Sequence, residues 1–551
     1  MYNPLDPFGI VSSCWEVQKA WLQHPRELSE ELNKLGAEAA ALASPQWLGG
    51  EDDLIPAVSY DERFQDPVWT KSAHFDTLKE FYLLYTRWFE DAIYRTPGAS
   101  EETKHKAAFW ARQGLNALAP TNYFFTNPVA LTRFMETGGK SVLDGWHNFA
   151  ADAGQGMVSL VRDSDFEVGV TLAATPGAVV FRNALMELIQ YAPATDKVHA
   201  IPIVIVSPWI NKYYILDLNE KKSLIRFLVN QGFTVFVTSW KNVGPEMRDT
   251  TLDDYLLDGV QEAVNVARAV CNVPQVHLAG YCIGGTISAA YMAWARGRGA
   301  GRAKSPVAHG TLLTTLVDFT DPGEIGVFVD ENSIRWLEDH MNQVGYLDGK
   351  SMAASFRLLR SNSLLWHYVV HNYLLGEAPP PFDVLYWNMD TTRLPAAMHS
   401  FYLREFYLNN KLVQKNGVTL GGRPIDLGRI DAPLYLVGTE QDHITPWKET
   451  FKLSHVAKGP IRYVLATSGH IMGIISPPVD PPKRRYWAGP IDGVDDAEAW
   501  RDATEKVPGS WWLDWVDWLR PQCGDLQPPP GLGSDAWPAL AEAPGTYVLE
   551  R

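Results

Sequence analysis

The sequence predicts an α/β fold, with a mainly parallel β-sheet, a large inserted cap and a mostly helical region before the sheet. Short apolar runs alternate with helical patterns from Ile201 onward, which is typical of β-α-β units. Strand patterns are missing between Leu316 and Asp431, where Trp, Tyr, Phe, Met and Pro are abundant. Earlier in the chain, as in the stretch 75–118, apolar residues recur at helical spacing.

These patterns set the predicted domain boundaries. We expect a mostly helical N-terminal region at 1–195, followed by an α/β domain at 196–526. Structureless loops longer than about 15 residues are uncommon in compact domains, so the segment 316–431 is predicted to be a mostly helical cap inserted into that domain. A proline-rich stretch then introduces a C-terminal tail at 527–551.

Composition and charge exclude several classes of protein. The 551 residues include 48 Lys and Arg against 64 Asp and Glu, and the net charge of -16 argues against a nucleic-acid partner. Four scattered cysteines suit neither a disulfide framework nor a Cys-based metal site, which favours a reducing, cytoplasmic location. We also expect no transmembrane segment, because no run of about 18 apolar residues occurs.

The expected sheet elements follow one another in a regular order. Helices are predicted at about 223–230, 253–270 and 283–296, between the first four strands. The six apolar runs predicted to be strands are 203–206, 234–238, 276–279, 311–315, 434–437 and 463–466.

The most informative motif is Gly280-Tyr281-Cys282-Ile283-Gly284-Gly285, between a predicted strand and a predicted helix. A lone G-x-C-x-G motif is weak, because a free cysteine is commonly a small buried apolar residue. In this context the motif resembles the nucleophile elbow of α/β-hydrolases, where glycines permit a tight turn that exposes the central side chain. The partial positive charge at the start of the following helix favours a thiolate. Cys282 is therefore the candidate nucleophile.

A candidate acid and base follow the last two predicted strands. Asp442 comes after the strand at 434–437, and His470 comes after the strand at 463–466. The chain order of nucleophile, acid and base is the one found in α/β-hydrolases. His470 would accept the thiol proton, and Asp442 would orient the ring and stabilise its cation. Glu440 remains an alternative acid and His443 an alternative base.

An oxyanion hole in this architecture uses two backbone N–H groups. The first belongs to the residue after the nucleophile, Ile283, and the second comes from the loop after an earlier strand. The loop Ser207-Pro208-Trp209-Ile210 occupies that place. Proline cannot donate, so Trp209 is the predicted donor, with Ile210 as the alternative.

A cysteine nucleophile favours acyl transfer over hydrolysis. Exchange of a thiolate with a thioester changes the free energy little, so an acyl-cysteine stays as activated as its substrate. It can then pass its acyl group to an alcohol, provided that water is kept out. The predicted aromatic cap could exclude water and hold an acyl or polymer chain.

These motifs resemble those of class I polyhydroxyalkanoate (poly-3-hydroxybutyrate) synthases of the α/β-hydrolase superfamily. The likeness covers about 127–487, with two modest departures at Val243 and Ser476. The matching runs are Pro208-Trp209-Ile210-Asn211-Lys212-Tyr213-Tyr214-Ile215-Leu216-Asp217, Ser239-Trp240, Asp253-Asp254-Tyr255, Gly280-Tyr281-Cys282-Ile283-Gly284-Gly285, Asp318-Phe319, Tyr386-Trp387-Asn388, Asp442-His443-Ile444 and Gly469-His470-Ile471.

The resemblance implies a function and a site. The chain would polymerise (R)-3-hydroxyacyl-CoA, such as the 3-hydroxybutyryl form, into polyester and release CoA. Cys282 would carry the acyl group, His470 would be the base, and Asp442 would complete the triad and is a proposed activator of the 3-hydroxyl. No cofactor and no metal would be needed. The resemblance also implies a mobile lid, a homodimer, and a place on the surface of cytoplasmic polyester granules, with granule-associated proteins as further partners.

Two other functions fit parts of the sequence. A cysteine hydrolase of the dienelactone-hydrolase type shares the order of Cys282, Asp442 and His470, although such enzymes need no large cap. A non-catalytic granule scaffold could keep the fold without the chemistry. Neither the accepted monomer length, the route of product exit nor the number of elongation sites follows from the sequence.

Overall fold

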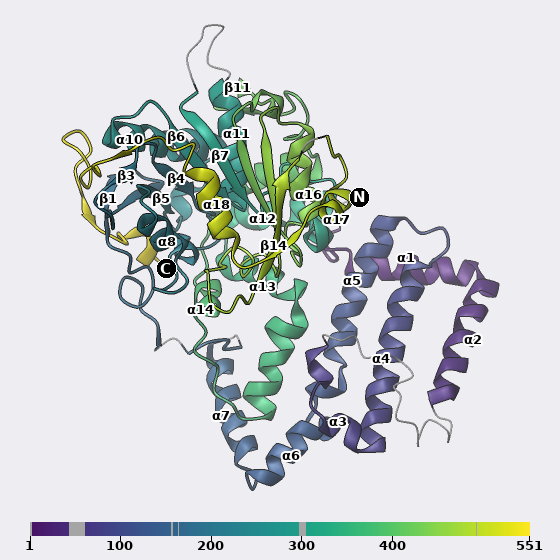
Figure 1. Ribbon diagram of the computed structural model, residues 1–551. Coiled ribbons are helices and arrows are strands. Elements are labelled where there is room, and N and C mark those ends of the chain that lie inside the picture. The colour runs from purple at the N-terminus through teal and green to yellow at the C-terminus, as the bar shows by residue number, and fades with distance from the viewer. Residues whose placement is uncertain (1–2, 43–60, 156–157, 163–164, 297–304, 492) are drawn as a thin grey trace. The chain divides into compact units, whose positions relative to one another are not determined.

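A computed structural model describes residues 3–42, 61–155, 158–162, 165–296, 305–491 and 493–551 (Figure 1). The chain forms two compact units. One comprises Met1–Asp163 and Ala354–Phe382, and the other comprises Ser164–Ala353 and Asp383–Arg551. We call them the helical unit and the α/β unit. Within the described residues, no helix is both long enough and apolar enough to cross a membrane.

The helical unit packs through several small apolar clusters, such as the one formed by Phe64, Trp69 and Tyr82 with their neighbours. Two of its helices begin at side-chain caps: the N–H of Thr103 donates to Ser100 at the start of α5, and Asn127 caps α6. Its helices are α1 (Ile10–Gln23), α2 (Pro25–Leu42), α3 (Val68–Lys71), α4 (Ala73–Tyr94), α5 (Glu101–Ala117), α6 (Pro128–Glu136), α7 (Lys140–Gln155), and the π-helices η10 (Asn362–Trp366) and η11 (Val369–Leu374).

The α/β unit is built on an eleven-stranded sheet in the order β15-β14-β13-β12-β7-β6-β4-β5-β2-β1-β17. The six predicted strands form its parallel centre, which confirms the predicted mainly parallel sheet. These central strands are β4 (Ile203–Val206), β5 (Val235–Trp240), β6 (Val276–Tyr281), β7 (Val307–Leu313), β12 (Leu434–Thr439) and β13 (Ile461–Ala466). The antiparallel flanking strands are β1 (Gly177–Arg182), β2 (Met186–Tyr191), β14 (Arg485–Pro490), β15 (Lys506–Pro508) and β17 (Ala541–Glu542).

Helices connect the central strands and bury the sheet in one continuous apolar core (Figure 1). Between β7 and β12 the α/β unit is largely helical, apart from two-residue strands. Its helices are α8 (Leu224–Asn230), α9 (Leu252–Asp254), η8 (Tyr255–Gln261), α10 (Glu262–Cys271), α11 (Ile283–Arg296), α12 (Glu331–Val344), α14 (Asp383–Met389), α15 (Ala396–Phe401), η12 (Tyr402–Leu408), α16 (Trp447–Phe451), α17 (Ala497–Ala503) and α18 (Trp511–Leu519), while α13 (Gly349–Leu359) passes from this unit into the helical unit.

The predicted boundaries need three corrections. Strands β1 and β2 lie inside the region predicted as helical at 1–195, so the sheet begins earlier than expected. The tail at 527–551 adds an edge strand to the sheet, because β17 pairs with β1. The stretch 354–382, predicted to be part of the cap, belongs to the helical unit, where for example the Asn116 amide donates to Ser361.

Candidate active site

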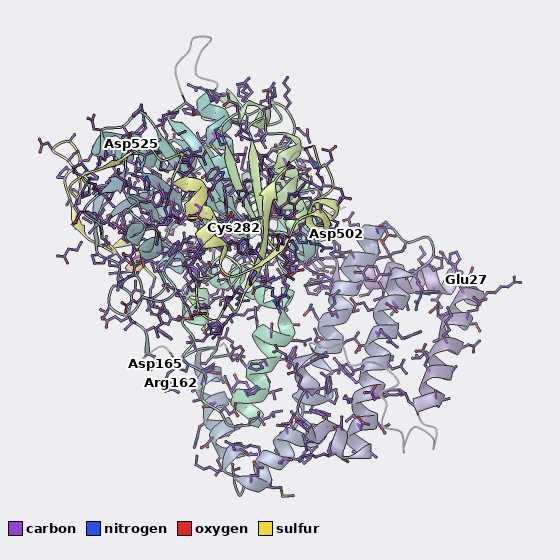
Figure 2. The ribbon with its side chains drawn as sticks, viewed as in Figure 1. Glu27, Arg162, Asp165, Cys282, Asp502 and Asp525 are labelled. Atoms are coloured by element: carbon purple, nitrogen blue, oxygen red, sulfur yellow. The ribbon has the colours of Figure 1, made fainter. Side chains whose placement is uncertain are left out.

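Cys282 lies at a sharp turn between β6 and α11, in the α/β unit (Figure 2). Its φ of 54° is left-handed, which is uncommon for a residue with a side chain. The N–H of Cys282 donates to the carbonyl of Leu313 at the end of β7, at 2.9 Å. A Cβ on Gly284 would come within 2.3 Å of the Val206 carbonyl oxygen, so glycine allows the helix to start this close to β4. The predicted elbow geometry is therefore present, with its side chain partly exposed.

His470 and Asp442 form a buried pair beside this turn. The Nδ1 of His470 lies 2.7 Å from the Oδ2 of Asp442. Asp442 also accepts hydrogen bonds from the N–H groups of Ile444 and Thr445, both at 2.9 Å, and from the hydroxyl of Thr439 at 3.0 Å. Two loops at the carboxyl ends of neighbouring strands thus converge, and the carboxylate is fixed by several donors.

His470 and Asp442 shift each other's pKa values in opposite directions. Burial alone would lower the pKa of His470, but the charges of Asp442 and of the Cys282 sulfur outweigh it and raise the pKa. Burial would raise the pKa of Asp442, but His470 and the N–H groups of Thr445 and Ile444 lower it. The charge of the Cys282 sulfur contributes to the raised pKa of His470, so the sulfur lies near the ring; because Nδ1 faces Asp442, Nε2 is the ring nitrogen left for sulfur.

The structure distinguishes the candidate acid and base from the alternatives that the sequence left open. Asp442, rather than Glu440, faces His470; the Glu440 side chain is partly exposed, and its N–H is bound to the carbonyl of Ala466. His443 is also partly exposed, whereas His470 is buried against Asp442. The geometry therefore brings together Cys282, Asp442 and His470.

The two predicted oxyanion donors are the N–H groups of Ile283 and Trp209. Neither the N–H of Ile283 nor that of Trp209 has an acceptor in the part of the chain that the structure describes. The loop that carries Trp209 is held in place at its start, because the N–H and the hydroxyl of Ser207 both donate to Thr238, at 3.0 and 2.6 Å. Both N–H groups remain predicted donors, available for a carbonyl oxygen.

Known proteins resemble this chain over nearly its whole length. Residues 60–228 match the family model "Poly-beta-hydroxybutyrate polymerase (PhaC) N-terminus", and residues 202–477 match the model "alpha/beta hydrolase fold". The poly(3-hydroxyalkanoate) polymerase of Methylorubrum extorquens is 43% identical over 98% of this chain and 89% of its own length. The PhaC subunits of the poly(3-hydroxyalkanoate) polymerases from Rhizobium etli and Cupriavidus necator are 38% and 39% identical, over 99% and 89% of this chain and 87% and 83% of their own.

The chain belongs to the poly(3-hydroxyalkanoate) polymerase family. This membership confirms the resemblance predicted from the motifs, and it makes the chain an acyltransferase enzyme. The family-model match also confirms the α/β-hydrolase fold that was predicted from the elbow and the strand order.

Sequence reasoning missed several residues around the candidate triad of this family member. The hydroxyl of Thr445 donates to Asp442 at 2.8 Å and lies 3.2 Å from the Nδ1 of His470. The ring of Tyr281 stacks on that of His470, with centroids 5.5 Å apart. Tyr281 stands in the elbow motif and could have been singled out, whereas a lone threonine carries no signal of its own. Burial is the main cause of the raised pKa of Tyr407, and the charge of Cys282 adds to it. This cap residue therefore lies near the sulfur.

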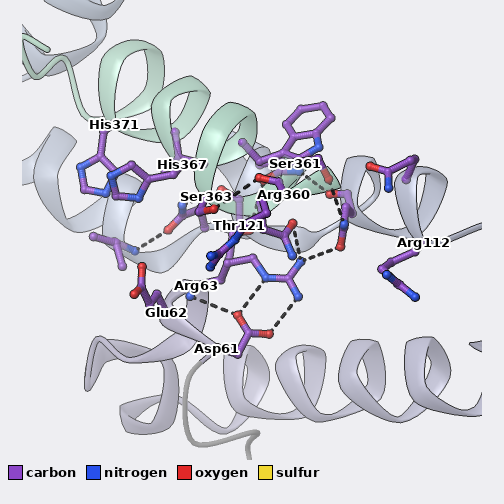
Figure 3. A pocket seen from close by; sticks show the side chains of 18 of the residues that line it. Asp61, Glu62, Arg63, Arg112, Thr121, Arg360, Ser361, Ser363, His367 and His371 are labelled. Atoms are coloured by element: carbon purple, nitrogen blue, oxygen red, sulfur yellow. Dashed lines mark hydrogen bonds and ion pairs between the residues drawn. The ribbon is translucent and has the colours of Figure 1, made fainter. Parts of the chain in front are cut away.

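The helical unit contains a separate cavity of about 530 Å³ that none of the predicted site residues line (Figure 3). Arg63 lies beside it and binds Asp61 through Nε and Nη2, at 2.9 and 2.8 Å. Its Nη1 also donates to Tyr82 and Asn362. Arg63 thereby links several segments of this unit. Within the described residues, no three His, Cys, Asp or Glu side chains are grouped as metal ligands.

Proposed function

We propose that this enzyme polymerises (R)-3-hydroxyacyl-CoA thioesters, including 3-hydroxybutyryl-CoA, into a polyester and releases CoA. The observation that carries the proposal is the placement of Cys282, at a strained elbow, near a buried His470 ring whose Nδ1 lies 2.7 Å from Asp442. Family membership supplies the class of product, because the relatives are named as poly(3-hydroxyalkanoate) polymerases.

The first chemical step is acylation of Cys282. His470 accepts the proton of the Cys282 thiol through Nε2, and Asp442, whose Oδ2 lies 2.7 Å from Nδ1, stabilises the imidazolium that forms. The thiolate attacks the thioester carbonyl, the bond from that carbon to the CoA sulfur breaks, and the Nε2 proton of His470 passes to the departing CoA. The acyl group is then held on Cys282 as a new thioester.

The second step forms the ester bond. A 3-hydroxyl oxygen attacks the carbonyl of the acyl-cysteine while His470, now neutral, accepts the hydroxyl proton. The new carbon–oxygen bond forms, the Cys282 thiolate leaves, and the imidazolium is restored. Asp442 keeps Nδ1 protonated through both steps, because it holds that side of the ring. The N–H groups of Ile283 and Trp209 would stabilise the negative oxygen that develops in each step.

The same proposal covers the setting of the reaction. These steps need only the chain's own residues and the CoA thioester, so we propose that the enzyme works without a metal or a cofactor. Because a growing polyester is insoluble in water, we propose that the enzyme works at the surface of cytoplasmic granules. We also propose a homodimer as the functional form.

The test is incubation of the purified protein with (R)-3-hydroxybutyryl-CoA. We expect free CoA together with insoluble polyester, and loss of both products in Cys282→Ala. Free CoA with only monomeric 3-hydroxybutyrate would instead show a cysteine hydrolase. Unchanged behaviour of Cys282→Ala, with no CoA release by either protein, would show a non-catalytic scaffold.

A further inference from the structure

A buried ammonium group belongs to the loop after β4, the loop that also carries the Trp209 N–H. The Lys212 side chain is almost fully buried, and its Nζ donates to the carbonyl oxygens of Glu550 and Tyr547, at 2.5 and 3.5 Å. Burying an ammonium costs several kcal/mol unless other groups replace its water. The two carbonyls belong to the C-terminal tail, so the tail supplies the solvation that lets this cation stay inside the protein.

Lys212 stands three residues after Trp209, and the loop between them is bound from the cap side. The hydroxyl of Thr392 donates to the carbonyl of Trp209 at 2.7 Å. The indole N–H of Trp387 donates to the carbonyl of Lys212 at 2.6 Å. Backbone contacts from the cap and the side-chain contact to the tail therefore restrain both ends of the segment that carries the Trp209 N–H.

The tail is itself fixed to the sheet, so it can act as a rigid support. The Glu550 carboxylate binds the Nζ of Lys241 and the N–H of Asn242, both at 3.2 Å, just beyond β5. Upstream, the N–H groups of Thr546 and Tyr547 donate to Glu187 on β2, at 2.9 and 3.0 Å. The position of the Lys212 ammonium is thus tied to two strands of the central sheet.

We propose that Lys212 is a positioning residue for the oxyanion hole: by binding the tail carbonyls of Tyr547 and Glu550, it sets the direction of the Trp209 N–H. This inference rests on the proposed function. An apolar side chain of similar volume would fill the same space, and replacing buried ions by apolar groups often leaves stability unchanged. The buried lysine therefore serves to orient the loop more than to stabilise the fold, since its bonds to the carbonyls of Tyr547 and Glu550 fix the loop in one position.

Charged groups of both signs lie near Lys212. Burial, Arg551 and Arg393 lower the pKa of Lys212, while Asp390 from the cap and Glu550 favour its charge without outweighing them. Arg393 ties the same parts together, because its backbone N–H donates to the Asn242 side chain at 2.9 Å and its Nη2 donates to the carbonyl of Arg551 at 3.0 Å. The loop after β4, the cap and the tail meet around Lys212, and a change there would be transmitted to Trp209.

The test compares Lys212→Met with Lys222→Met. Lys222 is a matched control, because its ammonium also joins the region after β4 to the cap, through Asp383 at 2.8 Å, but it lies farther along the chain from Trp209. Each protein is mixed with butyryl-CoA, which lacks the 3-hydroxyl and so leaves the acyl group on Cys282. Rapid quenching gives the acylation rate and its dependence on substrate concentration, and infrared spectroscopy of a ¹³C-labelled carbonyl reports hydrogen bonding to the acyl oxygen.

For Lys212→Met we expect an acylation rate about 10- to 100-fold lower with little change in KM, since displacement of an oxyanion donor acts on the transition state. The labelled carbonyl should absorb at higher frequency than in the unaltered enzyme, because it has lost part of a hydrogen bond. Lys222→Met should keep both the carbonyl frequency and an acylation rate within about threefold, whatever its loss in Tm.

A second variant covers the case in which Lys212→Met does not fold. Glu550→Ala leaves the carbonyl at 550 but removes the anchor to Lys241 and Asn242, so we expect a smaller shift in the same direction. An unchanged carbonyl frequency in folded Lys212→Met or Glu550→Ala would overturn the inference, and so would equal effects in Lys222→Met. If the unaltered enzyme forms no acyl-cysteine at all, the proposed function fails instead.

Discussion

The two units differ in where their backbones are strained. In the α/β unit, non-glycine residues with left-handed φ follow three of the central strands: Cys282 after β6 at 54°, Thr314 after β7 at 43° and Ser468 after β13 at 90°. In the described part of the helical unit, every residue with positive φ is a glycine. Each strained residue costs about 1–3 kcal/mol and persists only when its surroundings hold it.

The size of the core explains which unit can carry this cost. The α/β unit has one continuous apolar core that includes side chains from most strands of its sheet, whereas the helical unit packs through separate small clusters. The α/β unit also has left-handed residues elsewhere, at Ala173, Asn272, Asn410 and Asn416, but those at the carboxyl edge of the sheet include Cys282, which lies near His470. Changes at this edge should affect catalysis strongly, and changes in the helical unit should affect mainly stability.

The largest expected effect is that of Asp442→Asn. The amide keeps the size of the side chain but can no longer hold Nδ1 of His470 protonated, so the ring takes the wrong tautomer. We expect CoA release to fall by about 10³- to 10⁴-fold, measured with a thiol reagent. The variant should still fold, because Ile444 and Thr445 can donate to the remaining oxygen. Activity within tenfold of the unaltered enzyme would contradict the role of Asp442.

Gly284→Ala should have the next largest effect. The new methyl group would lie 2.3 Å from the Val206 carbonyl oxygen, so α11 must move away from β4. We expect a loss of about 1–3 kcal/mol in the free energy of unfolding from overpacking, and about 100-fold lower activity because the elbow shifts. Denaturant unfolding and the CoA assay measure the two effects. A variant with full activity would show that the close approach is not needed.

A pair of buried histidines should make the sheet sensitive to acid. His309 donates from Nε2 to the carbonyl of Gln522, and its Nδ1 lies 2.5 Å from the Nδ1 of His277. Burial lowers the pKa of His309 to about 4 and also lowers the pKa of His277. The unfolded chain binds protons below its ordinary pKa of about 6.5 while the folded protein does not, so stability is lost as pH falls from about 6.5 toward 4.

The test measures the free energy of unfolding by guanidinium at pH 7 and at pH 5. From the shift at His309 alone we expect a loss of about 2 kcal/mol between these values. His309→Gln, which can still donate to Gln522, should lose about 2 kcal/mol less. Equal losses in the two proteins would mean that His309 takes up its proton inside the folded sheet.

The smallest effect is expected in the helical unit. Gly114 lies within α5, and a Cβ there would meet no atom within 4 Å. Gly114→Ala should therefore stabilise the protein, by about 0.5–1 kcal/mol, because alanine loses less backbone entropy in a helix. CoA release should not change. Destabilisation by Gly114→Ala, or a loss of activity, would remove the contrast with Gly284.

Local patterns were enough to predict the centre of the α/β unit. The elbow around Cys282 could be predicted because its glycines, the preceding strand and the following helix are contiguous in sequence. The acid and base could be placed because Asp442 and His470 directly follow strands that lie side by side. These inferences needed only short-range periodicity and the rule that parallel strands end at one edge.

The parts of the chain on either side of this centre could not be predicted, because they are held by contacts between residues that are distant in sequence. Strand β2 contains Glu187 and Gln190, both buried, which hides its strand pattern. Their partners lie in the tail: Thr546 donates to Glu187, and Gln190 donates to the carbonyl of Gly531. Likewise, Tyr373 joins the helical unit through its bond to Asp152 at 2.6 Å. Neither pairing can be inferred from local residue patterns.

The central claim is that Cys282 carries the acyl group and that His470 makes it reactive. The most direct measurement is intact-protein mass spectrometry after brief mixing with (R)-3-hydroxybutyryl-CoA, followed by peptide mapping. We expect a 3-hydroxybutyryl adduct on Cys282 in the unaltered enzyme, and at the same time point no adduct in His470→Ala. An adduct on another residue, or one that forms on Cys282 equally fast without His470, would contradict the account.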